Sequence, residues 1–272
     1  CWRGQKAPVS ESWYGPIDTP EHIINHSIDQ HLNLLEGFNG LETGNKKRIS
    51  EMSNVRHVAL SLTGEPITYP LINEILKAFH KRKISTFLVT NSQYPEQIKK
   101  LEKATQLYLS IDAPNKELMK KIDNPLFKDF WERMLECLNL LKSRDYRTCI
   151  RLTLIKDENM CDLEGYSSLI KLGNPDFIEL KSYVHVGASR KFYSQNNMPN
   201  IEEMREFSSQ LLKKLPEYEY LKEHIQSRVI LLIKKSLKKK SWINFPKFFE
   251  LVQNNEFFNA EDYCSEIIMP NE

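Results

Sequence analysis

Polar side chains follow a β-type segment at residues 57–62, where the chain turns through Gly64, Glu65 and Pro66. Gly64 permits a sharp turn, and Pro66 prevents the strand from continuing. A carboxylate beside accessible backbone carbonyls attracts positive charge, so this turn suits a ligand that carries an ammonium group. Taken alone, the segment is explained equally well as an ordinary strand-to-helix turn.

The same arrangement recurs along the chain. Further polar pairs at predicted strand ends are Thr90 and Asn91, Ser110 and Asp112, Arg151 and Thr153, and Glu179 and Lys181. The carboxyl ends of parallel strands meet on one side of an α/β sheet or barrel, so we expect these side chains to line one mouth. Hydroxyls, amides and carboxylates there suit a ribose and an amino-acid moiety. For single residues other roles stay open: Asp112 as a helix cap, and Arg151 or Lys181 as an ion-pair partner of Glu179.

The elements that position these residues alternate between strand and helix. Strands are predicted at residues 57–62, 85–89, 107–111, 149–155 and 177–181, and helical segments lie between them. This alternation is typical of parallel βαβ units, in a doubly wound sheet or a barrel. A helix capped by Thr19 precedes them, residues 40–50 are predicted as a loop, and residues 218–221 and 229–233 as an antiparallel pair.

Composition sets the broad limits. With 272 residues, 40% of them hydrophobic, the chain can bury one large core or two modest ones. A net charge of +2 neither requires nor excludes a nucleic-acid partner. Two local clusters favour RNA contact: Arg190 with Lys191, and residues 234–240 with Lys238 and Lys239, beside which Trp242 could stack on a base. No apolar run approaches the roughly 20 residues that a membrane span needs.

The number and spacing of the cysteines argue against structural disulfide bonds. The five cysteines, an odd number without a Cys-x-x-Cys pair, are Cys1, Cys137, Cys149, Cys161 and Cys264. They indicate neither a disulfide framework nor a self-contained zinc site, so we interpret them as free thiols of a cytoplasmic protein. The first residues lack an initiator Met and a signal peptide, which is typical of a chain entered partway.

With these residues described, the chain resembles radical S-adenosylmethionine (radical-SAM) enzymes. It is similar over most of its length to the radical-SAM domain of the 4-demethylwyosine synthase family, which acts in wybutosine synthesis on tRNA. Eight segments carry the resemblance in order: residues 1–3, 17–21, 60–66, 87–91, 121–131, 151–154, 173–179 and 197–199.

The resemblance implies an α/β fold, a partial (βα)6 TIM-like barrel, at residues 1–215, with a β/α extension at residues 216–272 packed on it. It also implies S-adenosylmethionine and a 4Fe-4S cluster, with Cys1 as the last of three cluster cysteines. Gly64 and Glu65 would hold the methionine ammonium. The carboxylate and ribose would lie near Thr90, Asn91, Ser110 and Asp112, with Arg151 also at the cofactor. The substrates implied are phenylalanine tRNA, whose N1-methylguanosine beside the anticodon is modified, and pyruvate.

The departures from the family pattern concern what lies before Cys1. The first barrel strand, most of the cluster loop, and the family's further cysteines and pyruvate lysine are expected upstream, in a longer enzyme. An upstream flavodoxin-like domain is the expected electron donor. Two alternatives stay open: another radical-SAM enzyme, and a non-catalytic fragment that only binds tRNA. On either enzyme interpretation, Lys181, Arg190, Lys191, Lys238, Lys239 and Trp242 are the candidate substrate or RNA contacts.

Overall fold

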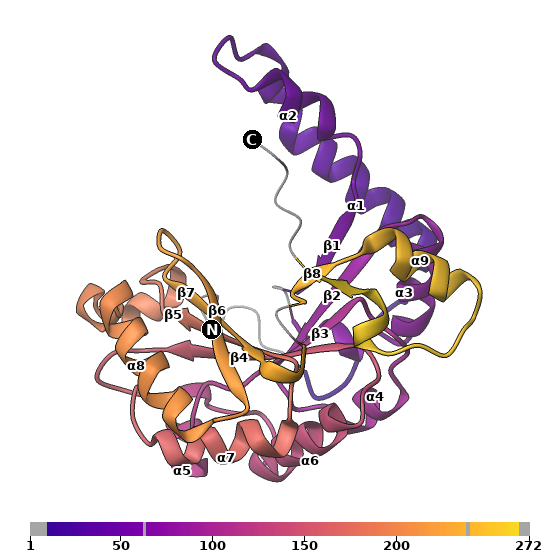
Figure 1. Ribbon diagram of the computed structural model, residues 1–272. Coiled ribbons are helices and arrows are strands. Elements are labelled where there is room, and N and C mark those ends of the chain that lie inside the picture. Colours follow the sequence, from indigo (N-terminus) through magenta and orange to yellow (C-terminus); the bar gives the residue numbers. More distant parts are fainter. Residues whose placement is uncertain (1–9, 62–63, 238–239, 267–272) are drawn as a thin grey trace.

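The computed structural model describes residues 10–61, 64–237 and 240–266 (Figure 1). Its main feature is a curved seven-stranded sheet in the order β1-β2-β3-β4-β5-β7-β6. The strands are β1 (His57–Leu60), β2 (Ser85–Thr90), β3 (Gln106–Ser110), β4 (Arg147–Leu154), β5 (Phe177–Ser182), β6 (Tyr218–His224) and β7 (Val229–Lys234). Strands β1 to β5 are parallel, and β7 lies antiparallel between β5 and β6. The predicted strand alternation and the antiparallel pair are therefore confirmed.

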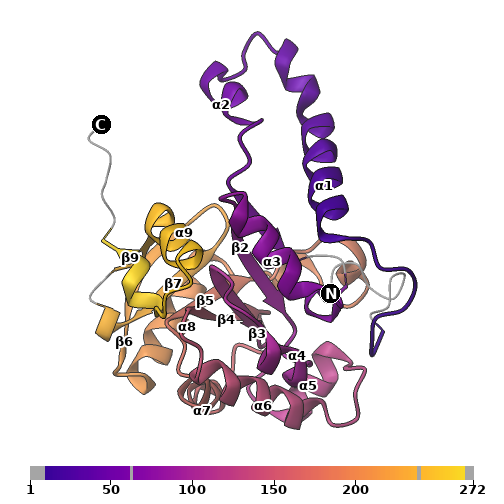
Figure 2. The ribbon, with the colours of Figure 1, turned by 90° about the vertical axis from the view of Figure 1, so that its right-hand side faces the viewer.

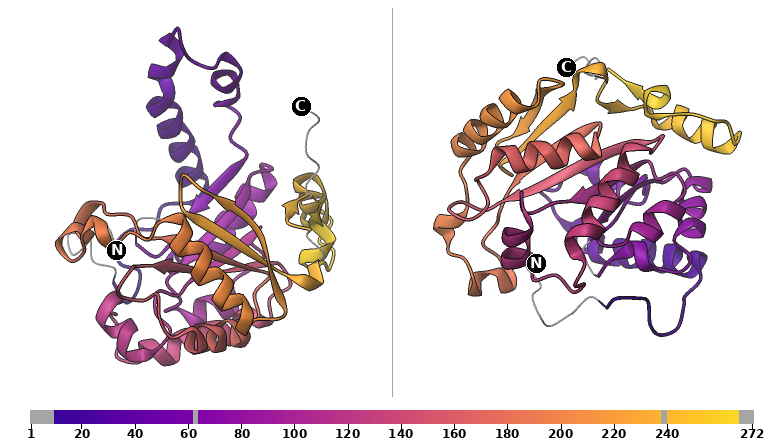
Figure 3. Two further views of the ribbon diagram at one scale, coloured as in Figure 1. Left: turned by 60° about the vertical axis from the view of Figure 1, so that its left-hand side comes forward. Right: turned by 90° about the horizontal axis from the view of Figure 1, so that it is seen from below.

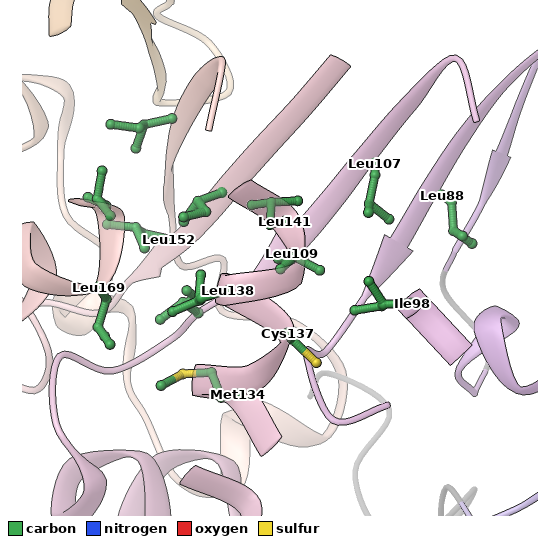
Figure 4. Packing of buried hydrophobic residues seen from close by; sticks show 14 of the residues in the cluster. Leu88, Ile98, Leu107, Leu109, Met134, Cys137, Leu138, Leu141, Leu152 and Leu169 are labelled. Atoms are coloured by element: carbon green, nitrogen blue, oxygen red, sulfur yellow. The ribbon is translucent and has the colours of Figure 1, made fainter. Parts of the chain in front are cut away.

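Helices cover the convex face of this sheet (Figures 1 and 3). They are α3 (Ile72–Lys81), α4 (Pro95–Lys100), α5 (Lys116–Asp123), α6 (Phe130–Lys142), α7 (Leu163–Gly173) and α8 (Ile201–Lys214). Figure 4 shows the layer between: Leu107 and Leu109 of β3 pack with Met134 and Leu138 of α6. Since side chains alternate along a strand, the residues between these leucines face the concave side.

The N-terminal helices project from the body (Figure 2). Helix α1 (Pro20–Leu35) begins as predicted, with the Thr19 hydroxyl accepting from the backbone N–H of His22. The expected loop at residues 40–50 is wrong in its second half, because α2 (Lys46–Glu51) forms there. The side chain of Asn45 caps α2 by accepting from the N–H of Arg48, a local hydrogen bond that stabilises a polar first turn.

The C-terminal segment forms a small unit of its own against the barrel. It holds β8 (Trp242–Ile243), α9 (Phe245–Gln253) and β9 (Cys264–Ser265), and β8 pairs antiparallel with β9. Helix α9 packs on α3, where the Phe248 ring meets the buried His80 edge-to-face at 5.0 Å. Among the described residues, no helix has the length and apolar character that crossing a membrane requires.

Candidate cofactor and substrate site

Glu65 is anchored at the end of β2, the strand next to its own. Its carboxylate accepts a hydrogen bond from Oγ1 of Thr90 at 2.7 Å and from the backbone N–H of Asn91, at 3.1 and 3.2 Å to the two oxygens. Burial raises the pKa of Glu65 to about 7, although both hydrogen bonds oppose that rise. The sequence placed these three residues at one mouth, and the structure brings them into direct contact.

Gly64 supplies an accessible stretch of backbone beside this carboxylate. Its φ of +68° is in the left-handed region, which any residue with a Cβ adopts at a cost. No described atom lies within 4 Å of the position that a Cβ would occupy. The turn therefore leaves room for another molecule to approach the backbone next to Glu65.

Asp112 takes the corresponding position after β3. Its carboxylate accepts from the backbone N–H of Thr153 on β4 at 3.1 Å. The interpretation of Asp112 as a helix cap is wrong, because α5 is capped by Asn115, whose side chain accepts from the N–H of Leu118. Burial raises the pKa of Asp112, while the Thr153 backbone bond opposes that rise. Ser110 precedes Asp112 on the same face and is in register with Arg151.

The side chain of Asn159 links the ends of two strands at this edge, and the sequence analysis did not identify it. It is fully buried, and its side-chain amide donates to the carbonyls of Asp112 at 2.8 Å and Thr153 at 2.7 Å. Its Oδ1 accepts from the N–H of Ile155 at 2.6 Å. Asn159 lies in a polar loop, where an Asn is commonly a surface turn residue, so only the fold reveals that it joins the ends of β3 and β4.

Arg151 and Glu179 form an ion pair across the concave face. They are register partners on β4 and β5, with Nε of Arg151 2.7 Å from Oε1 of Glu179. The guanidinium also lies over the Tyr108 ring, 4.9 Å from its centroid. Burial opposes the charge, but the neighbouring Glu179 carboxylate raises the pKa of Arg151 above its ordinary value. The ion-pair interpretation of Arg151 is confirmed.

Lys181 lies one step further along β5, in register with Thr153. Within the described part of the chain its side chain forms no ion pair, so the alternative pairing with Glu179 does not occur there. Lys181 is half-buried on the face that carries Arg151 and Glu179. A cation in this position is available to an anionic or polar ligand at the mouth.

The remaining candidates lie on two further segments or outside the described residues. Arg190 and Lys191 are exposed on a 3-10 helix (Gly187–Lys191) that follows β5. Trp242 is 56% exposed on β8, at the C-terminal segment. Cys1, Lys238 and Lys239 lie outside the described residues.

The described residues offer polar groups rather than a metal site. No group of three or more His, Cys, Asp or Glu side chains in residues 10–61, 64–237 and 240–266 is arranged to hold a metal ion. Cys137, Cys149, Cys161 and Cys264 are free thiols, as predicted, and all but Cys161 are buried. What the edge provides is two partly buried carboxylates, hydroxyls and open backbone, which match an ammonium group and a ribose.

Comparison with known proteins decides the family. A family model described as wyosine base formation matches residues 172–234, from the end of α7 to β7. A solved structure of TYW1 with a lysine-pyruvate adduct bound is 34% identical, with a TM-score of 0.74, and the match covers 80% of this chain and 70% of that chain. This chain belongs to the 4-demethylwyosine synthase family. A crystal structure of archaeal TYW1 is 31% identical with a TM-score of 0.71, over 86% of this chain and 76% of that chain.

The curated relatives are longer than this chain. The S-adenosyl-L-methionine-dependent tRNA 4-demethylwyosine synthase of Homo sapiens is 43% identical over 276 residues, which is 97% of this chain and 38% of that protein. The enzyme of Oryza sativa subsp. japonica is also 43% identical, over 97% of this chain and 42% of its own length. This chain thus spans about two fifths of the length of these relatives. The radical-SAM partial barrel expected from the sequence is confirmed by the similarity to the two TYW1 structures.

Proposed function

We propose that this chain carries the radical-SAM barrel of a tRNA 4-demethylwyosine synthase. The reaction joins N1-methylguanosine, 3' of the anticodon in phenylalanine tRNA, with pyruvate to form the tricyclic base of wybutosine synthesis. One observation carries the proposal: enzymes named for this activity are 43% identical over 97% of the chain. The finer enzyme class is a carbon-carbon lyase acting in the cytoplasm.

The carboxyl edge of the barrel fits S-adenosylmethionine. Glu65 and the Gly64 backbone would hold the methionine ammonium, since a carboxylate has about four acceptor positions and the Thr90 and Asn91 donors leave room for another. The ribose and carboxylate would contact Ser110, Asp112, Thr90 and Asn91, with Arg151 beside them. Cys1 would be one ligand of a 4Fe-4S cluster, and S-adenosylmethionine bound there would supply the radical chemistry that removes hydrogen from the substrate.

The cationic residues would bind the RNA. Lys181 reaches the mouth without an ion pair in the described structure, which supports a contact with a substrate anion. Arg190 and Lys191, with Lys238 and Lys239, would bind phosphates of phenylalanine tRNA, and Trp242 would stack on a base. Pyruvate is the second substrate, and an upstream flavodoxin-like domain would donate the electron.

The test is mass spectrometry of phenylalanine tRNA from cells that lack the gene, complemented with the complete open reading frame. We expect the tricyclic base to disappear on deletion and to return with the wild-type gene. Glu65→Gln should not restore it, because an amide cannot replace the charge facing the ammonium group. The matched control Glu74→Gln, an exposed position on α3, should restore it. A tricyclic base that persists in the deletion strain would contradict the proposed function.

A further inference from the structure

Two short segments meet at the carboxyl end of β5, and together they form a surface that we call the β5 rim. It consists of residues 181–192, which end β5 and follow it, and residues 222–228, which end β6 and turn into β7. Because β7 is antiparallel to β5, Val229 is in register with Lys181, and the N–H of Ser182 donates to the carbonyl of Arg228 at 3.0 Å. Both segments therefore lie at the same end of the sheet as the carboxyl edge.

The β5 rim carries an excess of positive charge. It holds five Lys or Arg side chains and one acid, Glu223, which is paired with Arg205 outside the rim. Since the whole chain has a net charge of only +2, the rest of it is net negative. Within residues 10–61, 64–237 and 240–266 no ion pair involves any of the five cations, which are Lys181, Arg190, Lys191, Lys222 and Arg228. Positive charge gathered in this way is typical of a surface that binds a polyanion.

Apolar side chains are exposed among these cations. Phe192 is 69% exposed and Ile225 is 54% exposed, and Val184 and Val186 are also open to solvent. An aromatic ring with a free face can stack on a nucleobase, and proteins bind single-stranded nucleic acids by combining such rings with cations. A duplex hides the faces of its bases, so this combination favours a loop or a single strand of RNA.

The segment that carries Phe192 is held in place by its own contacts. The hydroxyl of Tyr183 donates to Oγ of Ser189 at 2.9 Å, and the N–H of Phe192 donates to the carbonyl of Ser189 at 3.0 Å. The Tyr193 ring meets the Tyr183 ring edge-to-face at 5.5 Å. A ligand that binds here therefore has little chain to order, which reduces the entropic cost of binding.

The concave cavity near the amino ends of the strands differs from the rim. It has a volume of about 260 Å³ and is closed by β8 and the start of α9. Its cation, the buried Arg147, donates to Oε1 of Gln106 at 2.9 Å, Sγ of Cys264 at 2.8 Å and the carbonyl of Ser241 at 3.0 Å. Arg147 thus binds the C-terminal segment, whereas the cations of the rim are available to a ligand. The aromatic walls of the cavity are Phe87, Tyr108, Phe177, Trp242 and Phe245.

We propose that the β5 rim binds a single-stranded loop of the RNA substrate, with Phe192 stacked on an unpaired base and the rim cations on phosphates. The proposal rests on the proposed function, and it adds Phe192, Lys222 and Arg228 to the RNA contacts. Because Lys181 belongs both to the rim and to the mouth of the barrel, RNA on the rim lies next to the mouth. Stacking of one base on an aromatic side chain changes affinity by roughly five- to 150-fold.

The test measures how the full-length enzyme binds a fluorescent RNA hairpin with the sequence of the anticodon arm of phenylalanine tRNA, by anisotropy at several salt concentrations. Phe192→Ala should raise Kd about tenfold at each salt concentration, and Phe192→Trp should recover most of the loss. The matched control Phe257→Ala removes a ring that is 87% exposed on the C-terminal segment, and it should leave Kd unchanged.

The cations are tested through the salt dependence. Lys191→Gln and Arg228→Gln should each reduce the slope of log Kd against log salt concentration by about 0.7, the value for one phosphate contact of a single strand. The matched control Lys99→Gln removes an exposed cation of α4 and should leave the slope unchanged. Vesicles of phosphatidylserine, measured in parallel, test whether the rim binds an anionic membrane instead.

The outcomes separate this proposal from the proposed function. If wild-type enzyme forms the tricyclic base while Phe192→Ala binds the hairpin like Phe257→Ala, the rim assignment is overturned and the proposed function stands. Vesicle binding that Phe192→Ala weakens, with unchanged hairpin binding, would also overturn the assignment. If the wild type forms no tricyclic base but the hairpin responds to the rim variants as expected, the proposed function fails and the rim remains an RNA-binding surface.

Discussion

The carboxyl edge of the barrel and the concave cavity are built by different means. At the edge, Glu65 and Asp112 are each held by a backbone N–H of the next strand, that of Asn91 or Thr153. At the cavity, Arg147 is held by Ser241 and Cys264, which are 94 and 117 residues away in sequence. The edge follows from repeating parallel βα units, whereas the cavity depends on one distant segment returning to the barrel. Damage to one should therefore leave the other largely intact.

The largest effect is expected from Arg147→Ala. It leaves the Gln106 and Ser241 oxygens and the Cys264 thiol without their donor and opens a hole beside Phe177, which should lower the free energy of unfolding by about 4 kcal/mol. Denaturant unfolding measures the loss, and limited proteolysis should cut the C-terminal segment first. Simultaneous cutting in the barrel core would show that the two regions do not separate in this way.

Asn159→Ala should damage the edge and spare the cavity. It removes the partners of the Asp112 and Thr153 carbonyls and of the Ile155 N–H, at a cost of about 3 kcal/mol. Binding of S-adenosylmethionine should weaken, as measured by equilibrium dialysis on the cluster-loaded enzyme. The C-terminal segment should stay protected from protease, and its early cleavage would contradict the comparison.

The pH dependence of stability should report on Glu65 at the edge. Its folded-state pKa of about 7 exceeds the ordinary 4.5, so as pH rises the unfolded chain loses this proton first. The contribution of Glu65 to stability is then fully present below pH 4.5 and decreases up to pH 7, by no more than about 3 kcal/mol. Unfolding curves of wild type and Glu65→Gln across this range measure the difference, and parallel curves would refute the assignment.

The smallest effect is expected at a surface pair remote from both regions. Lys77 and Glu102 approach to 2.6 Å, but their side chains are 64% and 47% exposed. Lys77→Ala should change the free energy of unfolding by less than about 0.5 kcal/mol. This variant provides the baseline for the other measurements, and a loss above 1 kcal/mol would show that solvent does not screen the pair as expected.

Local pattern was sufficient for the positions of most elements. The five parallel strands, the Thr19 cap and the antiparallel pair follow from hydrophobic period and turn residues, which act over a few residues. The same reasoning failed at α2, where polar residues concealed a short helix capped by Asn45, and at Asp112, where a cap and a strand-bridging carboxylate look alike in sequence.

The contacts around the candidate site divide in the same way. The alternation of strands and helices put Glu65, Thr90 and Asn91 at one mouth, because parallel strands must all end on the same side. The residues next to Asn159 in sequence do not distinguish it from a surface turn residue. The residues next to Arg147 do not indicate that its guanidinium donates hydrogen bonds to Ser241 and Cys264. Such partners are chosen by how the whole chain packs.

The sequence by itself determined the class of fold, the order of the strands along the chain, the family resemblance and the residues of the carboxyl edge. The tertiary structure alone decided that Glu179 pairs with Arg151 rather than Lys181, that Asn159 joins two strand ends, and that Trp242 lies over an aromatic cavity. The physical reason is the distance along the chain over which each kind of interaction acts. Periodicity and turn chemistry are set by neighbours in the chain, whereas ion-pair choice and cavity closure depend on the register between strands and on the return of a distant segment.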